Sequence, residues 1–325
     1  MGFASAVAMF ILEWGPAPRD SRSKMTFKGR GAVAPIQEEF SVPHSYFVPA
    51  LVGGLIQGIV EWLPVSSKTM LTIYFAILGI RVQNAYNLGL IANFGSFFAA
   101  LYYFRREAWD TLKALAHPFA ADPYSRLLRF LVLGTLATGI VGIPLYITIR
   151  HTFTLVGGSV AMVLIGLLLL VTGFIARKKE RLMEASEASR PGVEEKPAHW
   201  RAALVVGGMQ GLAALPGISR SGMTITPLLW MGFEAEQAIR LSFMLDVLAL
   251  VGAGVVPLVI GGGGRAAVVA FGLSTTLVML VVASVVSFFA INTVLKWARR
   301  LRTSTVTFLI AGIALAVAGT AAVVH

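Results

Sequence analysis

The sequence predicts an all-α integral membrane protein with six transmembrane helices and two re-entrant helix–turn–helix hairpins in an inverted-topology repeat. The first observation is composition: 56% of the 325 residues are hydrophobic and 13% are charged, whereas a soluble domain carries about 25% charged residues. The second is a pair of similar apolar segments, each interrupted near its middle, in corresponding places of the chain. The third is the clustering of cations between apolar segments, which is typical of cytoplasmic loops.

Charge and cysteine content exclude several other classes of function. The net charge is +11, but its cations lie in the loops between apolar segments, so we expect membrane lipids rather than nucleic acid as the surroundings. The chain has no cysteine, which excludes a disulfide framework, a thiol nucleophile and a cysteine-based metal site. We therefore expect a multi-pass protein of the plasma membrane.

The chain divides into an extension and one membrane domain. Residues 1–44 form an N-terminal extension that we expect to be poorly ordered, because its apolar start is too short to span a bilayer. Residues 45–325 form a single membrane domain with repeat halves at about 45–179 and 200–325. The segment 180–199 carries charges of both signs and is predicted to be the linker between the halves.

Within the domain, apolar length predicts the spans, since a transmembrane helix needs roughly 20 mostly apolar residues. Six segments meet this requirement: about 85–104, 127–149, 154–176, 240–263, 268–293 and 304–324. Two further apolar segments, 48–79 and 202–232, are interrupted by Pro64-Val65-Ser66-Ser67 and by Pro216-Gly217-Ile218-Ser219-Arg220-Ser221-Gly222. Each half of these segments is too short to span alone, so a hairpin that enters and leaves on one side is favoured.

Loop charges predict the orientation of these elements. The loops at 105–129, 177–201 and 296–302 hold most of the cations of the domain, and the other connections hold few. With the three cation-rich loops in the cytoplasm, the first hairpin opens to the outside and the second to the cytoplasm, which is an inverted repeat.

One carboxylate and one cation at the hairpin turns are the first candidates for a functional site. Glu61 interrupts an apolar run and shares a helix face with Gln57, and a carboxylate at membrane depth is a functional candidate. Arg220 in the second turn offers a planar fork of donors that suits phosphate. Two alternatives remain open: Glu61 is solvated at the membrane interface, or Arg220 only neutralises Glu61 and so helps to fix the fold.

Other polar residues surround these two in the sequence. The hydroxyl-bearing and glycine residues of the turns could bind phosphate or merely cap helices, and they are Ser66, Ser67, Thr69, Gly217, Ser219, Ser221 and Gly222. Lys68 could extend to the interface or contact a phosphate. Asp246 could pair with Arg220 or Arg240, or help to hold a metal. Asn93 breaks the span 85–104 and could contact the first hairpin, and Gln57 and Gln210 could bond to each other across the repeat axis.

These turns carry a family resemblance. The segments EWLPVSS at 61–67 and PGISRSG at 216–222, supported by FGSFFAALYYFRR at 94–106 and LSFML at 241–245, resemble the undecaprenyl pyrophosphate phosphatase family of the bacitracin-resistance type. The resemblance implies six spans with two re-entrant helix pairs. It also implies hydrolysis of a polyprenyl pyrophosphate lipid to the monophosphate carrier plus phosphate, with a divalent cation, Mg²⁺ or Ca²⁺, as cofactor.

The resemblance also assigns roles to residues. It implies that Glu61, Ser67 and Arg220 are catalytic and that Glu61 is a metal ligand. From this resemblance and from the polar residues discussed above, we predict that the following residues bind the substrate: Gln57, Ser66, Lys68, Thr69, Asn93, Gln210, Gly217, Ser219, Ser221, Gly222 and Asp246. The sequence departs from the family pattern at Gln57 in place of a Glu, at Met70 in place of a His, and at Asp246 in place of an Ala-like residue.

Two other functions remain open because of these departures. One is a transporter or flippase of a polyprenyl phosphate with weak or lost hydrolysis, since inverted repeats with broken helices are a transporter architecture. The other is a lipid-binding protein without turnover. The oligomeric state is equally open, with a homodimer as one option.

Overall fold

The computed structural model describes residues 46–63, 65–155, 158–188, 196–297, 304–305, 307–312 and 314–315. The predicted extension 1–44, Pro64 in the first turn and most of the predicted linker 180–199 beyond residue 188 lie outside these residues, as does much of the predicted span 304–324.

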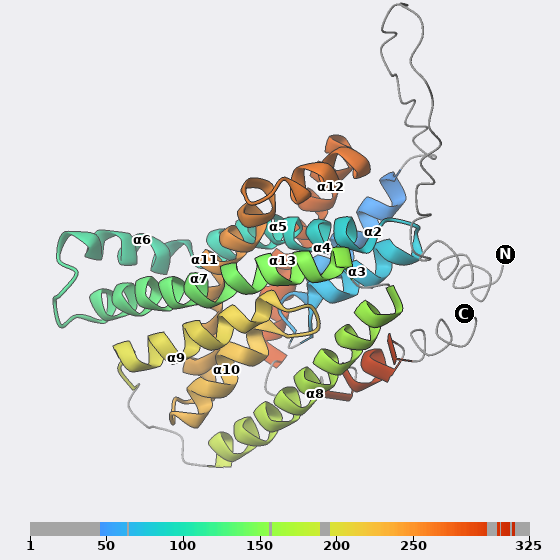
Figure 1. Cartoon of the computed structure of the whole chain (residues 1–325). Helices are drawn as coiled ribbons and strands as arrows, with labels where there is room; N and C mark the ends of the chain where they lie inside the picture. Colours follow the sequence, from blue (N-terminus) through green and yellow to red (C-terminus); the bar gives the residue numbers. More distant parts are fainter. Residues whose placement is uncertain are drawn as a thin grey trace, which may run out of the picture.

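Helices are the regular elements of the described residues, and Figure 1 shows them packed into one bundle. The α-helices are α2 (Phe47–Val60), α3 (Ser67–Ile77), α4 (Val82–Ile91), α5 (Asn93–Tyr103), α6 (Arg105–Lys113), α7 (Pro123–Leu155), α8 (Gly158–Ala188), α9 (Trp200–Gly211), α10 (Arg220–Trp230), α11 (Ala235–Val259), α12 (Gly263–Phe271) and α13 (Leu273–Trp297). Short 3₁₀ turns follow α6 and α9. The all-α class predicted from the sequence is therefore confirmed.

Three helices of the described residues are long and apolar enough to cross a membrane: Pro123–Ile149 within α7, Ala235–Val259, which is α11, and Leu273–Thr293 within α13. Two predicted spans need correction. The segment 85–104 is not one helix, because α4 ends at Ile91 and α5 begins at Asn93. The segment 268–293 is divided at Gly272, whose φ of 94° separates α12 from α13.

The two halves match element by element. Helices α9, α10 and α11 begin the same number of positions after α2, α3 and α4, respectively. We call this number, the separation of Phe47 and Trp200, the repeat offset. At the same offset, Gly79 and Gly232 follow α3 and α10 with φ values of 85° and 77°. The halves differ where the break between α4 and α5 has no counterpart in the continuous α11.

The first helix of each hairpin packs against a long helix of the other half. Helix α2 lies against α13, where a Cβ at Gly54 would come within 2.7 Å of the Met279 carbonyl oxygen. Helix α9 lies against α7, where a Cβ at Gly207 would come within 2.1 Å of the Gly134 carbonyl oxygen. Glycine lets the backbones approach this closely, as in other membrane-type helix contacts. The halves are therefore interlocked, and both hairpin turns lie inside the bundle.

Candidate active site

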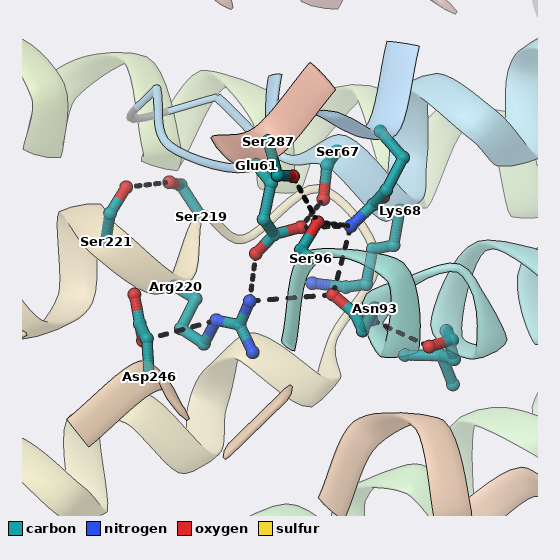
Figure 2. Close-up of polar contacts among 12 residues, drawn as sticks. Glu61, Ser67, Lys68, Asn93, Ser96, Ser219, Arg220, Ser221, Asp246 and Ser287 are labelled. Atoms are coloured by element: carbon teal, nitrogen blue, oxygen red, sulfur yellow. Dashed lines mark hydrogen bonds and ion pairs between the residues drawn. The ribbon is translucent and has the colours of Figure 1, made fainter. Parts of the chain in front are cut away.

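The turns of the two hairpins meet at one cavity of about 310 Å³. Its polar end is lined by charged, amide and hydroxyl side chains from both halves: Glu61, Ser66, Ser67, Lys68, Asn93, Gln210, Ser219, Arg220 and Ser221. Figure 2 shows Glu61 and Asn93 pointing toward the Arg220 guanidinium, with Ser67 directed at Glu61 and Asp246 on the other side of the guanidinium. Predicted site residues that lie far apart in the chain thus form one cluster.

Glu61 is at the centre of this cluster. It follows the last residue of α2 and is only 8% exposed. Its Oε2 accepts hydrogen bonds from Gln57 Nε2 at 2.7 Å and from Ser67 Oγ at 2.5 Å, and its Oε1 is paired with Arg220. The alternative that Glu61 is solvated at the interface is therefore wrong. The neighbouring Trp62 is buried edge-on against Phe243, which fixes the backbone at this position.

The first residues of α3 supply a hydroxyl and a cation. Ser66 has the extended backbone of an N-cap, and Ser67 and Lys68 are the first two residues of the helix. The first N–H groups of a helix have no intrahelical acceptor and form a ready anion site. Lys68 is buried, and its Nζ donates to the Ile218 carbonyl at 3.0 Å. Extension of Lys68 to the interface is thereby ruled out, and its ammonium keeps two further N–H donors at the cavity.

Arg220 is the first residue of α10, and it lies between two carboxylates. Its Nη2 is paired with Glu61 and lies 3.5 Å from Asn93 Oδ1, while its Nε lies 3.3 Å from Asp246 Oδ1. The predicted neutralisation of Glu61 is confirmed, and it leaves the phosphate-binding hypothesis open. Arg220 and Arg240 were both predicted as possible ion-pair partners of Asp246, and in the structure the partner is Arg220. Arg240 instead pairs with Glu107 at 3.5 Å.

Amides and hydroxyls surround the charged residues. Gln57 Nε2 also donates to Asn93 Oδ1 at 3.3 Å and to Ser96 Oγ at 3.2 Å, which confirms the predicted contact of Asn93 with the first hairpin. Gln210 Nε2 donates to Asp246 Oδ1 at 3.5 Å, so the predicted bond between Gln57 and Gln210 is wrong. Sequence reasoning missed Ser96, although it lies on the same helix face as Asn93, one turn later.

A second group of predicted residues shapes the turns instead of facing the cavity. Gly217 has a φ of 93°, and a Cβ there would lie 2.8 Å from the Leu168 side chain. Its N–H donates to Thr69 Oγ1 at 2.6 Å, and its carbonyl accepts from Thr172 Oγ1 at 2.5 Å. The Gly222 N–H donates to Ser219 Oγ at 3.4 Å as part of the helix cap. Because these groups are satisfied within the protein, the geometry gives Thr69, Gly217 and Gly222 a structural task, and their role in substrate binding stays a prediction.

Away from the charges, the cavity is an apolar trough between α7 and α11. Small residues, aliphatic side chains and one aromatic ring form its walls: Thr135, Thr138, Gly139, Gly142, Ile143 and Tyr146 from α7, and Leu248, Ala249, Gly252, Ala253 and Val256 from α11. Tyr86 lies in the same wall and donates to the Ala214 carbonyl at 2.5 Å. None of these wall residues was predicted, because their spacing along the sequence is that of any buried helix.

Glu61 and Gln57 are the residues considered as oxygen ligands for a divalent cation. Gln57 Oε1 is buried without a hydrogen-bond partner in the described part of the chain, one helical turn before Glu61. No group of three His, Cys, Asp or Glu side chains that could hold a metal occurs among the described residues. A carboxylate and an amide oxygen suit Mg²⁺ or Ca²⁺ only when phosphate or water oxygens complete the shell. The described residues therefore supply no complete shell by themselves, and a cation would bind here only together with a phosphate.

Comparison with known proteins identifies relatives over most of the chain. The family model of the bacitracin resistance protein BacA matches residues 50–318. A protein of Saccharolobus islandicus named undecaprenyl-diphosphatase is 39% identical over 256 residues, which cover 78% of this chain and 89% of the relative. A protein of the same name from Methanopyrus kandleri is 35% identical over 270 residues, covering 82% and 94% of the two chains. The protein therefore belongs to the bacitracin resistance protein BacA family.

Proposed function

We propose that this protein hydrolyses an undecaprenyl-type polyprenyl pyrophosphate to the monophosphate lipid carrier and inorganic phosphate. One observation carries the proposal: the N-termini of α3 and α10 meet at the polar end of an apolar trough, and a hydroxyl and a guanidinium are both bonded to one carboxylate there. Helix N-termini and guanidinium groups attract phosphate. A serine hydroxyl that donates to a carboxylate is the arrangement of an activated nucleophile.

The shape of the cavity supports a lipid diphosphate as the substrate. The diphosphate would occupy the polar end beside Arg220 and Lys68, and the isoprenoid chain would lie in the trough between α7 and α11. The glycines of the trough leave room for the chain: a Cβ at Gly252 would meet no atom within 4 Å. A ligand with a purely polar body would leave this apolar surface uncovered.

In the proposed reaction, Ser67 Oγ attacks the terminal phosphorus and its proton passes to Glu61 Oε2. The bond between that phosphorus and the bridging oxygen breaks, and the lipid monophosphate leaves with the bridging oxygen. Water then attacks the phosphoserine, inorganic phosphate leaves, and Ser67 regains its proton. Arg220 and Lys68 stabilise the charge on the phosphate oxygens, which is the main resource of phosphoryl-transfer enzymes. A divalent cation held by Glu61 and Gln57, when bound, would supply further neutralisation of the diphosphate.

We also propose the finer topology predicted from the sequence, with two re-entrant hairpins and an inverted repeat in the plasma membrane. Of its six spans, one would cross as the pair α4 and α5 and another as α13 alone. The hairpin helices α2, α3, α9 and α10 have 14, 11, 12 and 11 residues, and at 1.5 Å per residue each is shorter than the roughly 30 Å hydrocarbon core. The exchange of packing partners between halves, α2 with α13 and α9 with α7, supports a pseudo-twofold axis. Labelling of single introduced cysteines in the loops at 105–129 and 177–201 from each side of the membrane tests this orientation.

The decisive experiment measures phosphate release from undecaprenyl diphosphate by purified protein in detergent, with Mg²⁺, with Ca²⁺ and with a chelator. We expect release that requires the cation and that is lost in Glu61→Ala and Arg220→Ala. Asp110→Ala is the matched control, because Asp110 forms an exposed ion pair with Lys113 at 3.0 Å and does not line the cavity. Full turnover by both site variants would refute the proposed roles.

Transport of a lipid phosphate is the competing function, because the interlocked repeat with short helices is also a transporter architecture. The bond between Ser67 and Glu61 favours hydrolysis, since translocation requires no nucleophile. Reconstituted vesicles that contain a non-hydrolysable diphosphate analogue separate the two. Translocation of its headgroup without phosphate release from the natural lipid would favour the transporter.

A further inference from the structure

The repeat places an asparagine and an aspartate in equivalent positions. Asn93 and Asp246 are related by the same repeat offset that relates the helices of the two halves. Each accepts a hydrogen bond from the glutamine of its own half: Asn93 from Gln57 at 3.3 Å and Asp246 from Gln210 at 3.5 Å. The same bond thus occurs twice, with a neutral acceptor in the first half and an acidic one in the second.

Asp246, the acidic residue of this pair, lies beside the Arg220 guanidinium. Asp246 is 2% exposed, and its Oδ1 lies 3.3 Å from Arg220 Nε. On the other edge of the guanidinium, Nη2 is engaged by Glu61 and Asn93. Within the described residues, Arg220 Nη1 has no acceptor at all, and Arg220 lines the cavity.

The contacts at Nε and Nη2 of Arg220 determine where Nη1 points. A guanidinium is planar, so contacts at Nε and Nη2 fix its plane and leave Nη1 in one direction. Without Asp246, the group can rotate about the remaining contact with Glu61. A phosphate bound at Nη1 would then lose its fixed donor, although the positive charge would still be present.

We propose that Asp246 is a positioning residue for Arg220: it anchors Nε so that Nη1 is presented to the terminal phosphate of the substrate. The inference rests on the proposed function, and it assigns Asp246 no contact with the substrate. It also explains the asymmetry of the pair, because an acid at position 93 as well would add a third carboxylate beside Glu61 and repel the diphosphate.

The test uses the repeat itself. Asp246→Ala removes the anchor, Asp246→Asn keeps an oxygen but not the charge, and the double variant Asn93→Asp/Asp246→Asn moves the carboxylate to the equivalent position of the other half. Asp110→Asn serves as the exposed control. For each protein we would measure kcat and KM for undecaprenyl diphosphate, the inhibition constant of inorganic diphosphate, and the thermal unfolding midpoint.

We expect kcat/KM of Asp246→Ala to fall on the order of 100-fold, which is the effect of a misplaced binding group. For Asp246→Asn we expect a fall of roughly tenfold. Most of the loss should be in kcat, and the inhibition constant for diphosphate should rise. The double variant should be no more active than Asp246→Asn, because Asn93 Oδ1 lies beside Nη2 and a carboxylate there leaves Nε without a charged partner. Folded Asp246→Ala with unchanged kcat/KM and unchanged diphosphate inhibition would overturn the proposal.

A purely structural role gives a different pattern. The unfolding midpoint would then fall in both single variants while kcat/KM per folded molecule stayed constant, and this result would also overturn the proposal. Recovery of activity in the double variant, which leaves Nε unanchored, would overturn it as well. If the wild-type protein releases no phosphate, the proposed function fails separately. In that case, the stabilisation of the wild-type protein by inorganic diphosphate, compared with that of Asp246→Asn, still measures the positioning of Arg220: equal stabilisation contradicts it, and weaker stabilisation of the variant supports it.

Discussion

The turn after α2 and the turn before α10 occupy equivalent places in the two halves, yet they carry different charged side chains: Glu61 and Lys68 lie at the first turn, and Arg220 lies at the second. The first turn contributes Glu61 and the hydroxyl of Ser67, and the second contributes Arg220. The N-cap serines of the two following helices, Ser66 and Ser219, are related by the same repeat offset as the helices themselves. The backbone is therefore repeated, while the reactive side chains are divided between the copies.

This division has a physical reason. Two identical turns would bring like charges together in a buried site, where neither could be solvated. Opposite charges instead stabilise each other, and they leave a base on one side of the cavity and an anion-binding group on the other. We therefore expect Glu61 of the first turn to govern the chemical step, and Arg220 of the second turn, together with Lys68, to govern phosphate binding.

The largest expected effect is loss of the base in the first turn. Glu61→Gln keeps the shape of the side chain but cannot take the proton of Ser67, so kcat/KM should fall by about 10³-fold, within the range for a general base. Phosphate release at saturating and limiting substrate measures it. Glu107→Gln, in an ion pair with Arg240 on the surface, is the control. A fall of less than about tenfold would show that Glu61 is not the base.

Replacement of the guanidinium in the second turn should follow. Arg220→Lys keeps the charge, but an ammonium cannot reach Glu61, Asn93 and Asp246 in one plane. We expect kcat/KM to fall by about 10²-fold, with weaker inhibition by inorganic phosphate than in the wild type. Equal phosphate inhibition in both proteins would contradict the assignment of phosphate binding to this turn.

The next prediction concerns the free energy of unfolding, to which the backbone of the second turn contributes through Gly217. Gly217→Ala should lower the free energy of unfolding by about 2 kcal/mol or more, because φ is 93° and the new Cβ would meet Leu168 and the Ile165 carbonyl. Gly79→Ala is the matched control: its φ is 85°, but no atom lies within 4 Å of the Cβ, so it should cost only about 1 kcal/mol. Thermal unfolding midpoints of the two variants give the difference, and equal values would mean that crowding at Gly217 is relieved.

The smallest effects concern the paired glutamines. Gln57 donates to the Glu61 carboxylate at 2.7 Å, whereas Gln210 makes one long contact with Asp246 at 3.5 Å. Gln57→Ala should therefore lower kcat/KM by about tenfold, in line with a hydrogen bond to a charged group, and Gln210→Ala by no more than about threefold. Phosphate release under identical conditions compares them. A larger loss for Gln210→Ala would reverse the proposed division between the halves.

Local sequence features predicted much of this arrangement. The i, i+4 spacing of Gln57 and Glu61 places both on one helix face, and the structure joins them by a hydrogen bond. Interruption of two apolar segments predicted the two hairpins, since a helix cannot continue through such turns. The pairing of Arg220 with Glu61 followed from the cost of leaving either charge buried alone.

Other parts of the site depend on contacts that no local pattern encodes. Ser287 of α13 donates to Ser96 at 3.0 Å across 191 positions, and Thr172 of α8 holds the second turn through Gly217 and Ser219. The trough between α7 and α11 and the break between α4 and α5 likewise arise from packing.

The all-helical membrane class, the repeat and the charged residues of the site can be predicted from the sequence, because length, hydropathy and spacing are properties of the chain itself. Contacts between distant helices set which carboxylate anchors each edge of Arg220, which polar groups form hydrogen bonds within the turns, and where the cavity lies. Those choices depend on distances between helices of different halves, and a single helix cannot set them.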